Sequence, residues 1–270
     1  LGTVPFLGHR KLISAVLRRR RRSAIPIVDM GGGPSGQGQE AFRYLRTSLQ
    51  YSSAGHPPQV LMVTSSVPEE GKSTVCSNLA AIFAEKGERT LVIDSDLRKP
   101  ILHQAFGISR MPGLSDILTG QKSADEVIVQ SPIPHLDMIP AGPATPSPLN
   151  LLDSKAMTDL LDELKGKYAT IVIDSAPCSA VADSLVLAQK VEGICLVVRV
   201  GSTLMEILEN TVMRLQSMND TRILGVVYNR MKAEVVMGYG YGYGYGYGYG
   251  QYGQKYGGSY LNPPSKESTS

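Results

Sequence analysis

Short apolar runs that are typical of strands alternate with longer runs that are typical of helices over residues 40–237. The apolar runs, typical of buried strands, are residues 59–65, 89–96, 136–142, 168–177, 193–200 and 223–229. The runs that we interpret as helices are residues 40–51, 72–87, 157–167 and 204–218, of which 157–167 is clearly amphipathic. In the first of these, Phe42, Leu45 and Leu49 fall on one helical face. Because near-continuous apolar strands separated by helices indicate a mainly parallel sheet covered on both faces, we expect a three-layer α/β fold.

Composition divides the chain into three parts. Residues 1–39 are basic and then glycine-rich, which is typical of a linker, and residues 40–237 carry the alternating pattern. Residues 238–270 begin with an unbroken Gly-Tyr alternation, and we expect this tail to be disordered because glycine at every second position weakens a strand. Nine of the thirteen tyrosines lie in it: Tyr239, Tyr241, Tyr243, Tyr245, Tyr247, Tyr249, Tyr252, Tyr256 and Tyr260. On composition alone, a flexible low-complexity segment without a chemical role explains this tail.

The charge is distributed unevenly. The net charge is +3, but Arg10, Lys11 and Arg18–Arg22 contribute seven positive charges and residues 1–22 contain no acid, so the remainder carries −4. A mildly acidic body gives no reason to expect nucleic-acid binding. The basic segment is either a solvated linker or a segment that lies against an anionic membrane surface. No run approaches the 18 apolar residues of a membrane span.

The three cysteines are far apart in the sequence. Cys76, Cys178 and Cys195 have no metal-ligand or redox spacing, so we expect buried free thiols in a reducing compartment.

The turn after the run at residues 59–65 has the features of a phosphate-binding loop. It reads SSVPEEGKST, residues 65–74, and Gly-Lys-Ser between a strand and a helix ends such a loop. The glycine permits close backbone approach, the lysine reaches the outer phosphates, and the serine hydroxyl can bind Mg²⁺. Candidate nucleotide-binding residues are Ser66, Glu70, Gly71, Lys72, Ser73 and Thr74. Ser66 stands where the usual pattern has glycine. Without its strand and helix context, the Gly-Lys-Ser tripeptide could equally mark an ordinary helix N-terminus.

Carboxylates follow two of the other apolar runs. Asp94 and Asp96 end one run and Asp174 ends another, so a parallel sheet brings all three to the edge where ligands bind. A single carboxylate at a strand end is equally well explained as a structural cap for the following turn. Three beside a phosphate loop would repel one another without a cation, and Mg²⁺ on nucleotide phosphates supplies one. These residues predict a P-loop nucleotide-hydrolase-type fold that uses ATP and Mg²⁺.

The sequence resembles the bacterial tyrosine kinases, the cytoplasmic kinases of capsule and exopolysaccharide export, from about residue 36 onward. The motifs that carry the resemblance are EAFRYLRTSL, TSSVPEEGKST, VIDSDLRKP, PGLSDILTG, LDMIPAGPATPSPLNLL, IVIDSAP, VVRVGST and the tyrosine-rich tail. The opening LGTVPFLG and basic run are similar to the segment that links the family's membrane part to its kinase. Glu69 departs from the family's frequent glycine.

The resemblance implies roles for the matching residues. Lys72 would neutralise phosphate charge; Ser73, Asp96 and Asp174 would serve the metal, with Asp174 acting through water; and Asp94 would accept the tyrosine proton, although the sequence does not separate Asp94 from Asp96. The helix residues Glu40, Arg43 and Arg46 match the family's E-x-x-R-x-x-R ring-assembly motif, and a solvated helix face with an i,i+3 ion pair is the alternative.

The function implied is ATP-dependent phosphorylation of the tail tyrosines, between subunits of a ring-shaped homo-oligomer. The expected location is the cytoplasmic face of the bacterial inner membrane, with a membrane polysaccharide co-polymerase or activator as partner. Two other functions remain open at this point: a partition-type ATPase switch, and a binding module with a vestigial nucleotide site. Nine tyrosines argue against the switch, and intact Lys72, Ser73 and aspartates argue against the vestigial site.

Overall fold

The computed structural model describes residues 3–5, 36–52, 57–218 and 221–231, all within one compact unit, Leu1–Lys232. The predicted tail, 238–270, lies outside the described residues. The strands are β1 (Thr3–Pro5), β2 (Val60–Ser65), β3 (Thr90–Asp94), β4 (Val129–Gln130), β5 (Leu136–Ile139), β6 (Thr170–Asp174), β7 (Gly193–Arg199) and β8 (Ile223–Met231). The helices are α1 (Gly36–Gln50), α2 (Lys72–Ala84), α3 (Leu102–Phe106), α4 (Leu114–Leu118), α5 (Ala124–Val127), α6 (Pro148–Asp153), α7 (Lys155–Lys165), α8 (Asp183–Ala188) and α9 (Met205–Gln216).

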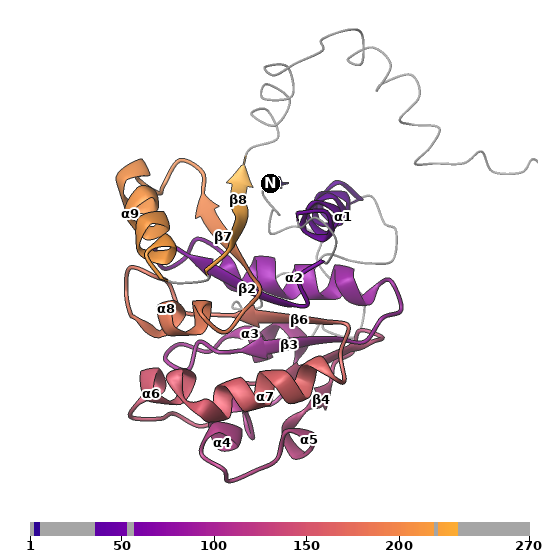
Figure 1. Cartoon of the computed structure of the whole chain (residues 1–270). Helices are drawn as coiled ribbons and strands as arrows, with labels where there is room; N and C mark the ends of the chain where they lie inside the picture. Colours follow the sequence, from indigo (N-terminus) through magenta and orange to yellow (C-terminus); the bar gives the residue numbers. More distant parts are fainter. Residues whose placement is uncertain (1–2, 6–35, 53–56, 219–220, 232–270) are drawn as a thin grey trace, which may run out of the picture. The chain divides into compact units, whose positions relative to one another are not determined.

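The described strands form one sheet in the order β1-β8-β7-β2-β6-β3-β5-β4 (Figure 1). Every neighbouring pair is parallel except β4 and β5, which pair antiparallel. The expected mainly parallel sheet is therefore confirmed. β2 lies between β7 and β6, so the loop that follows it is near the middle of the sheet's carboxyl edge.

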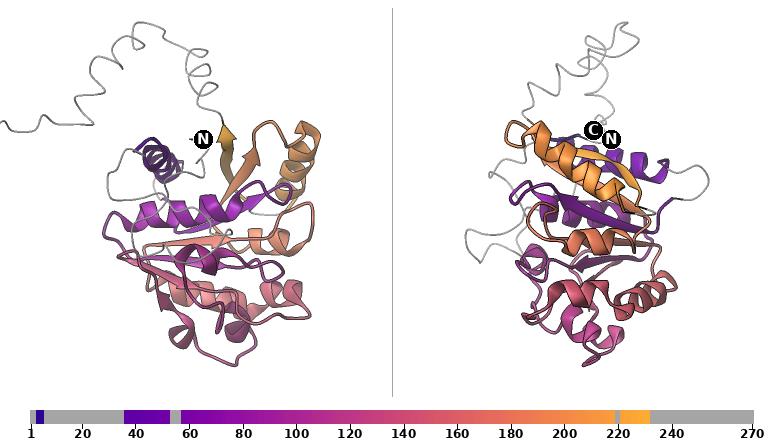
Figure 2. Two further views of the ribbon diagram at one scale, coloured as in Figure 1. Left: turned by 180° about the vertical axis from the view of Figure 1, so that it is seen from behind. Right: turned by 60° about the vertical axis from the view of Figure 1, so that its left-hand side comes forward.

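Helices cover both faces of the sheet, as the apolar pattern predicts (Figure 2). On one face α1, α2 and α3 pack with side chains such as Leu61 and Val63 of β2. On the other face α4 to α8 and Leu215 of α9 pack with the alternate β2 side chains Val60 and Met62. Since successive strand side chains point to opposite faces, each strand supplies both cores and the three-layer arrangement is confirmed.

The first helix has the apolar face that its sequence predicts. Phe42, Leu45 and Leu49 are buried in the core shared with α2. α2 packs against α1 on one side and against β2, β3 and β6 on the other, and this explains why ten consecutive residues from Val75 to Ala84 are buried. The phosphate loop leads directly into α2, so the loop is anchored to a helix whose residues are almost all buried.

The structure also contains elements that the pattern does not predict. The helices α3, α4, α5, α6 and α8 have four to six residues each, too few to show a helical period. Within the predicted linker 1–39, Thr3–Pro5 pairs with β8, and α1 starts at Gly36 rather than Glu40. The remainder of that linker, including its arginine run, lies outside the described residues.

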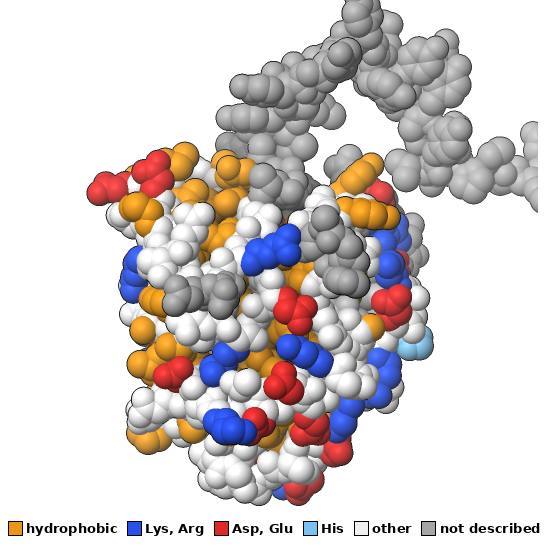
Figure 3. Space-filling view, in the orientation of Figure 1, with side chains coloured by type: hydrophobic (Ala, Val, Ile, Leu, Met, Phe, Trp, Pro, Cys, Tyr) orange, Lys and Arg blue, Asp and Glu red, His pale blue; other side chains and the backbone are white. Residues whose placement is uncertain are grey.

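The surface mixes charges of both signs, and hydrophobic side chains gather over α9 (Figure 3). Leu204, Met205 and Met213 are each more than half exposed there. Among the helices that the structure describes, none combines the length and apolar character needed for a membrane span.

Candidate active site

The loop between β2 and α2 has the geometry of a phosphate-binding turn. Gly71 caps α2 in the left-handed conformation with φ 94°. A Cβ at this position would stand 2.1 Å from Nδ2 of Asn229, so space as well as backbone conformation requires glycine. The N-terminus of α2, which begins at Lys72, therefore opens at the carboxyl edge of the sheet, where free N–H groups favour an anion.

The structure brings the predicted lysine and aspartates together beside this loop. In the pairing of β3 with β6, Asp94 is the direct partner of Asp174. The Lys72 ammonium lies 2.9 Å from Oδ2 of Asp96 and 3.7 Å from Oδ1 of Asp174. It also donates to Oγ of Ser73 at 3.3 Å. One cation thus compensates carboxylates from the ends of two strands.

Burial and neighbouring charges shift the pKa values of the ionisable groups at this edge. Burial would lower the pKa of Lys72, but Asp174 and Asp96 more than reverse this and raise the pKa of its ammonium above its ordinary value. Burial raises the pKa of Asp174, and the charge of Lys72 only partly offsets this effect. No described donor meets full hydrogen-bond geometry with either carboxylate oxygen of Asp174, although the Ser73 hydroxyl and the Lys72 ammonium are near enough to offset part of the rise in its pKa. Asp174 therefore carries a charge that the described side chains stabilise incompletely.

Asp94 lies deeper than the other two carboxylates. Its side chain is fully buried, and Oδ2 accepts a hydrogen bond from the Leu102 amide at 3.0 Å. Burial, followed by the nearby charge of Asp174, raises the pKa of Asp94 well above its ordinary value. Asp96 instead pairs directly with Lys72. This arrangement separates the two aspartates that the sequence leaves equivalent, and the proton-accepting role of Asp94 stays a prediction.

The donor set fits Mg²⁺ held jointly with a nucleotide. Ser73, Asp96 and Asp174 offer hard oxygen ligands, and the two buried oxygens of Asp174 would gain most from a cation. The described residues contain no group of three or more His, Cys, Asp or Glu that could hold a metal by itself. Mg²⁺ usually takes one or two protein carboxylates and completes its shell with phosphates and water.

Two further features of this edge are not evident from the sequence. Asn229, two residues before the end of β8, donates from Nδ2 to the Glu70 carbonyl at 2.8 Å and supports the loop from outside. Arg98 makes a two-pronged ion pair with the buried Asp183, at 2.7 and 3.0 Å, and fixes the turn after β3 to α8. Each contact joins residues at least 85 positions apart, and no local pattern signals such pairs.

The remaining loop residues have separate environments. Ser66 is fully buried, and its hydroxyl has no partner among the described residues, while its carbonyl accepts from the Ser179 amide at 3.0 Å. Thr74 accepts through its carbonyl from the side chains of Ser77 and Asn78, one turn farther along α2. The Glu70 carboxylate is buried and bonded on the side of β7.

The predicted assembly residues make contacts within the chain. Arg43 donates to both carboxylate oxygens of Glu85, at 2.6 and 3.2 Å, and pairs with Glu40 at 3.3 Å. Arg46 donates to the Ile82 carbonyl at 2.8 Å. The i,i+3 pair of Arg43 and Glu40 is present, and the contacts to α2 show that these arginines also fasten α1 onto α2.

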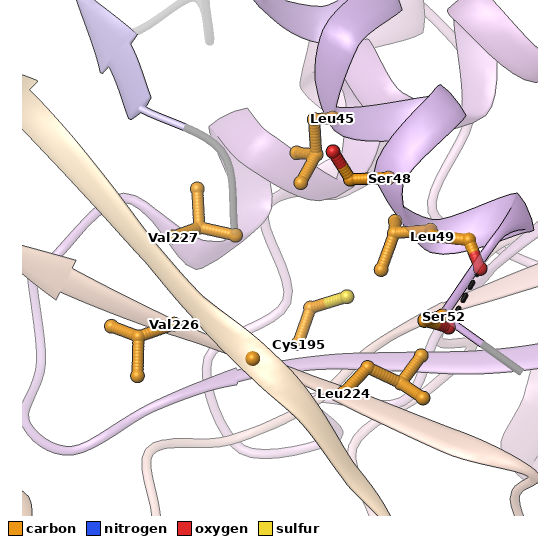
Figure 4. Close-up of a pocket in the computed structure, with 9 residues that line it drawn as sticks. Leu45, Ser48, Leu49, Ser52, Cys195, Leu224, Val226 and Val227 are labelled. Carbon is orange, nitrogen blue, oxygen red and sulfur yellow. Dashed lines mark hydrogen bonds between the residues drawn. The ribbon is translucent and has the colours of Figure 1, made fainter. Parts of the chain in front are cut away.

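The cysteines are free and buried, as their spacing predicts. Cys195 lines a cavity of about 250 Å³ between α1 and β8. The residues around this cavity are largely apolar, with Ser48 and Ser52 on the α1 side (Figure 4). Because the cavity contains none of the loop residues or aspartates, it is separate from the candidate active site.

Comparisons with known proteins identify relatives of this chain. Residues 69–220 match the protein family described as AAA domain. Tyrosine-protein kinase YwqD of Bacillus subtilis is 34% identical over 222 residues, which cover 82% of this chain and 92% of that protein. The putative tyrosine-protein kinase EpsB of Ralstonia solanacearum is 38% identical over 269 residues, which cover 99% of this chain but 35% of that protein. The chain thus spans about a third of EpsB.

Solved structures show the same likeness in three dimensions. The kinase domain of Escherichia coli tyrosine kinase ETK has a TM-score of 0.77 at 30% identity, over 92% of this chain and 94% of that one. The septum site-determining protein MinD of Pyrococcus horikoshii, solved in complex with Mg-ADP, has a TM-score of 0.56 at 22% identity, over 67% and 76% of the chains. The second likeness concerns the fold alone.

Proposed function

The chain belongs to the bacterial protein-tyrosine kinases, and we propose that it transfers the γ-phosphoryl group of ATP to tyrosines of its own tail, residues 238–270. One observation carries the proposal most directly: the Lys72 ammonium stands between Asp96 and Asp174 where the phosphate loop enters α2. This places a cation, two carboxylates and a helix N-terminus within one site, and phosphoryl transfer depends mainly on positioning and charge stabilisation.

The chain's own residues have distinct tasks in this proposal. Backbone N–H groups of the loop and of the first turn of α2 bind the phosphates, from Ser66 through Gly71 to Thr74. Lys72 turns from the carboxylates toward the phosphates and neutralises their charge. Ser73, Asp96 and Asp174 would hold Mg²⁺, which when bound stabilises the negative charge of the outer phosphates. Asp94 or Asp96 accepts the proton of the attacking tyrosine.

The nine tyrosines Tyr239, Tyr241, Tyr243, Tyr245, Tyr247, Tyr249, Tyr252, Tyr256 and Tyr260 are the proposed acceptors. A 22-residue chain with this glycine content is expected to span about 25 Å. A body of this size has a radius of about 20 Å, so reach permits transfer within or between subunits. We favour transfer between subunits because Glu40, Arg43 and Arg46 match an assembly motif. Each phosphotyrosine adds about −1.5 to −2 charges, so neighbouring tails would repel and loosen the assembly.

The proposed setting follows from the resemblance to capsule and exopolysaccharide kinases. The partners would be a membrane polysaccharide co-polymerase, upstream or on a separate chain, and the anionic inner membrane surface. At that surface, each of the seven basic residues could add about 1 kcal/mol to the free energy of membrane binding. These residues are Arg10, Lys11 and Arg18–Arg22. Binding to anionic vesicles that weakens with salt would support this, and equal binding to neutral vesicles would contradict it.

A mixing experiment tests phosphorylation between subunits. A full-length Lys72→Met chain is incubated with Mg-ATP and an active chain truncated after Gly238, and the tail is examined by mass spectrometry. We expect phosphate on the Lys72→Met tail only when the truncated active chain is present, and smaller assemblies by size exclusion afterward. An unlabelled tail in the mixture contradicts transfer between subunits, and an unchanged size contradicts the charge-driven loosening.

The control for the lysine is Lys155→Met. Lys155 is 86% exposed on α7 and pairs only with Asp159 among the described residues, so its loss removes the same charge far from the loop. We expect Lys155→Met to phosphorylate its own tail and Lys72→Met alone not to do so. Undiminished phosphorylation by Lys72→Met alone would overturn the assignment of the site.

A further inference from the structure

The phosphate loop is held on its outer side by the buried carboxylate of Glu70. Glu70 is 1% exposed. Its Oε2 accepts from the Val67 amide at 2.8 Å, and this bond closes the loop on itself. Its Oε1 accepts from the Arg199 amide at 3.3 Å and from the hydroxyl of Thr203. One carboxylate thus joins the loop to the end of β7 and to the turn that leads into α9.

The strand order explains why this contact can act on the loop. β2 lies between β6 and β7, so the loop after β2 has the aspartates on its β6 side and Glu70 bonded on its β7 side. The Glu70 carbonyl is also bonded to Asn229 near the end of β8. The residue before Gly71 is therefore fixed by three separate strand ends or turns, immediately before the segment that would receive the phosphates.

Electrostatics alone gives no reason for an acid at this position. A carboxylate near bound phosphates repels them, and a buried carboxylate loses its hydration. Three donors compensate that loss here, and hydrogen bonds to a charged acceptor are about twice as strong as neutral ones. The gain from such an arrangement is order in the loop before any ligand arrives, since a preorganised site loses less conformational entropy when it binds.

We infer that Glu70 and Thr203 are positioning residues that clamp the phosphate loop to the β7–α9 turn in the form that binds ATP. The inference rests on the proposed function, because it assigns ATP as the ligand of this loop. It adds the side chain of Thr203 to the site and gives the Glu70 carboxylate a role other than contact with the nucleotide. The clamp also links occupancy of the loop to the start of α9.

Two neighbouring acids provide a matched test. Glu70→Gln keeps the shape but leaves one of the backbone donors of Val67 or Arg199 without an acceptor. Glu69→Gln removes the same charge from an exposed adjacent side chain. We expect the Kd for Mg-ATP, measured by calorimetry, to rise about tenfold in Glu70→Gln and to stay level or fall slightly in Glu69→Gln. If charge repulsion governed this region, both variants would bind more tightly, and that result would overturn the clamp.

Thr203 supplies an independent pair of variants if Glu70→Gln folds poorly. Thr203→Val removes the hydroxyl at nearly constant shape, and Thr203→Ser restores it. We expect a Kd about threefold higher for Thr203→Val and close to the original value for Thr203→Ser. Equal affinities for Val and Ser would overturn the role of the hydroxyl.

Kinetic and exchange measurements separate positioning from general stability. Well below the unfolding temperature, we expect the KM for ATP to rise in Glu70→Gln with a much smaller change in kcat. Mg-ATP should slow amide hydrogen exchange at residues 199–204 in the original chain and not in Glu70→Gln. A lowered Tm with unchanged KM would show a purely structural role. Failure of the unaltered chain to bind Mg-ATP would instead contradict the proposed function itself.

Discussion

Replacing Asp174 by asparagine should stabilise the ligand-free protein while it removes activity. The Lys72 ammonium at 3.7 Å attracts this carboxylate by about 4 kcal/mol at an effective dielectric constant of 20. Desolvation of a fully buried carboxylate costs several kcal/mol, and Asp96 adds repulsion. Because the pKa of Asp174 is raised, the unfavourable contributions exceed the attraction. We therefore expect Asp174→Asn to increase the free energy of unfolding by about 1–2 kcal/mol at pH 8.

The pH dependence follows from the sign of that shift. A carboxyl group whose pKa is higher in the folded state contributes its stabilisation fully below the unfolded pKa, and that contribution is lost as pH rises through the folded value. The original chain loses this contribution as the pH rises through the folded pKa of Asp174, whereas asparagine does not titrate. The difference between the two proteins should therefore be small near pH 4 and grow as the pH increases.

Urea unfolding followed by circular dichroism at several pH values measures this difference. Asp96→Asn is the matched control, because Asp96 accepts from Lys72 at 2.9 Å and from the Lys99 amide at 3.0 Å. We expect Asp96→Asn to destabilise the fold by about 1–3 kcal/mol. A loss of more than about 1 kcal/mol in Asp174→Asn at pH 8 would refute the reasoning, as would a difference that does not change with pH.

Two other predictions concern the loop glycine and the thiols. Gly71→Ala should abolish nucleotide binding and cost clearly more stability than Gly87→Ala, which has a similar φ of 82° but open space around its Cβ; equal losses of Tm in the two variants would contradict the steric account. Burial raises the pKa of Cys195 to about 12 and raises the pKa values of Cys76 and Cys178, so iodoacetamide at pH 8 should label all three thiols only after unfolding. Alkylation of any of them in the folded protein, detected by peptide mass spectrometry, would contradict that prediction.

The sequence predicts the parts of the site that depend on local order. Gly71, Lys72 and Ser73 are consecutive and lie between a strand and a helix, and Asp94 and Asp174 end strands that a parallel sheet aligns at one edge. The same local periodicity places Phe42, Leu45 and Leu49 in the core. Such features need only the period of an element and the direction of the strands.

The parts that the sequence does not predict depend on how distant elements meet. Thr203 bonds to Glu70 across 133 positions, and Asn229 reaches the same residue across 159. Arg43 matches a sequence motif from which we predict assembly, yet in the described part of the chain it bonds to Glu85, 42 residues away, at 2.6 Å. Pairs of this kind are fixed by the packing angles of helices and strands, which neither residue encodes alone.

The strand order has a consequence for when the site can form during synthesis. β2 is made early, but its two neighbours in the sheet, β6 and β7, are completed only at Asp174 and Arg199. About 130 residues separate Ser65 from Arg199, and a ribosome needs roughly 7 to 27 s to add them. Until then the phosphate loop lacks at least one of the two strands that flank β2. Nucleotide can therefore assist folding of the nascent chain only after β7 has emerged, however early the Gly-Lys-Ser segment is translated.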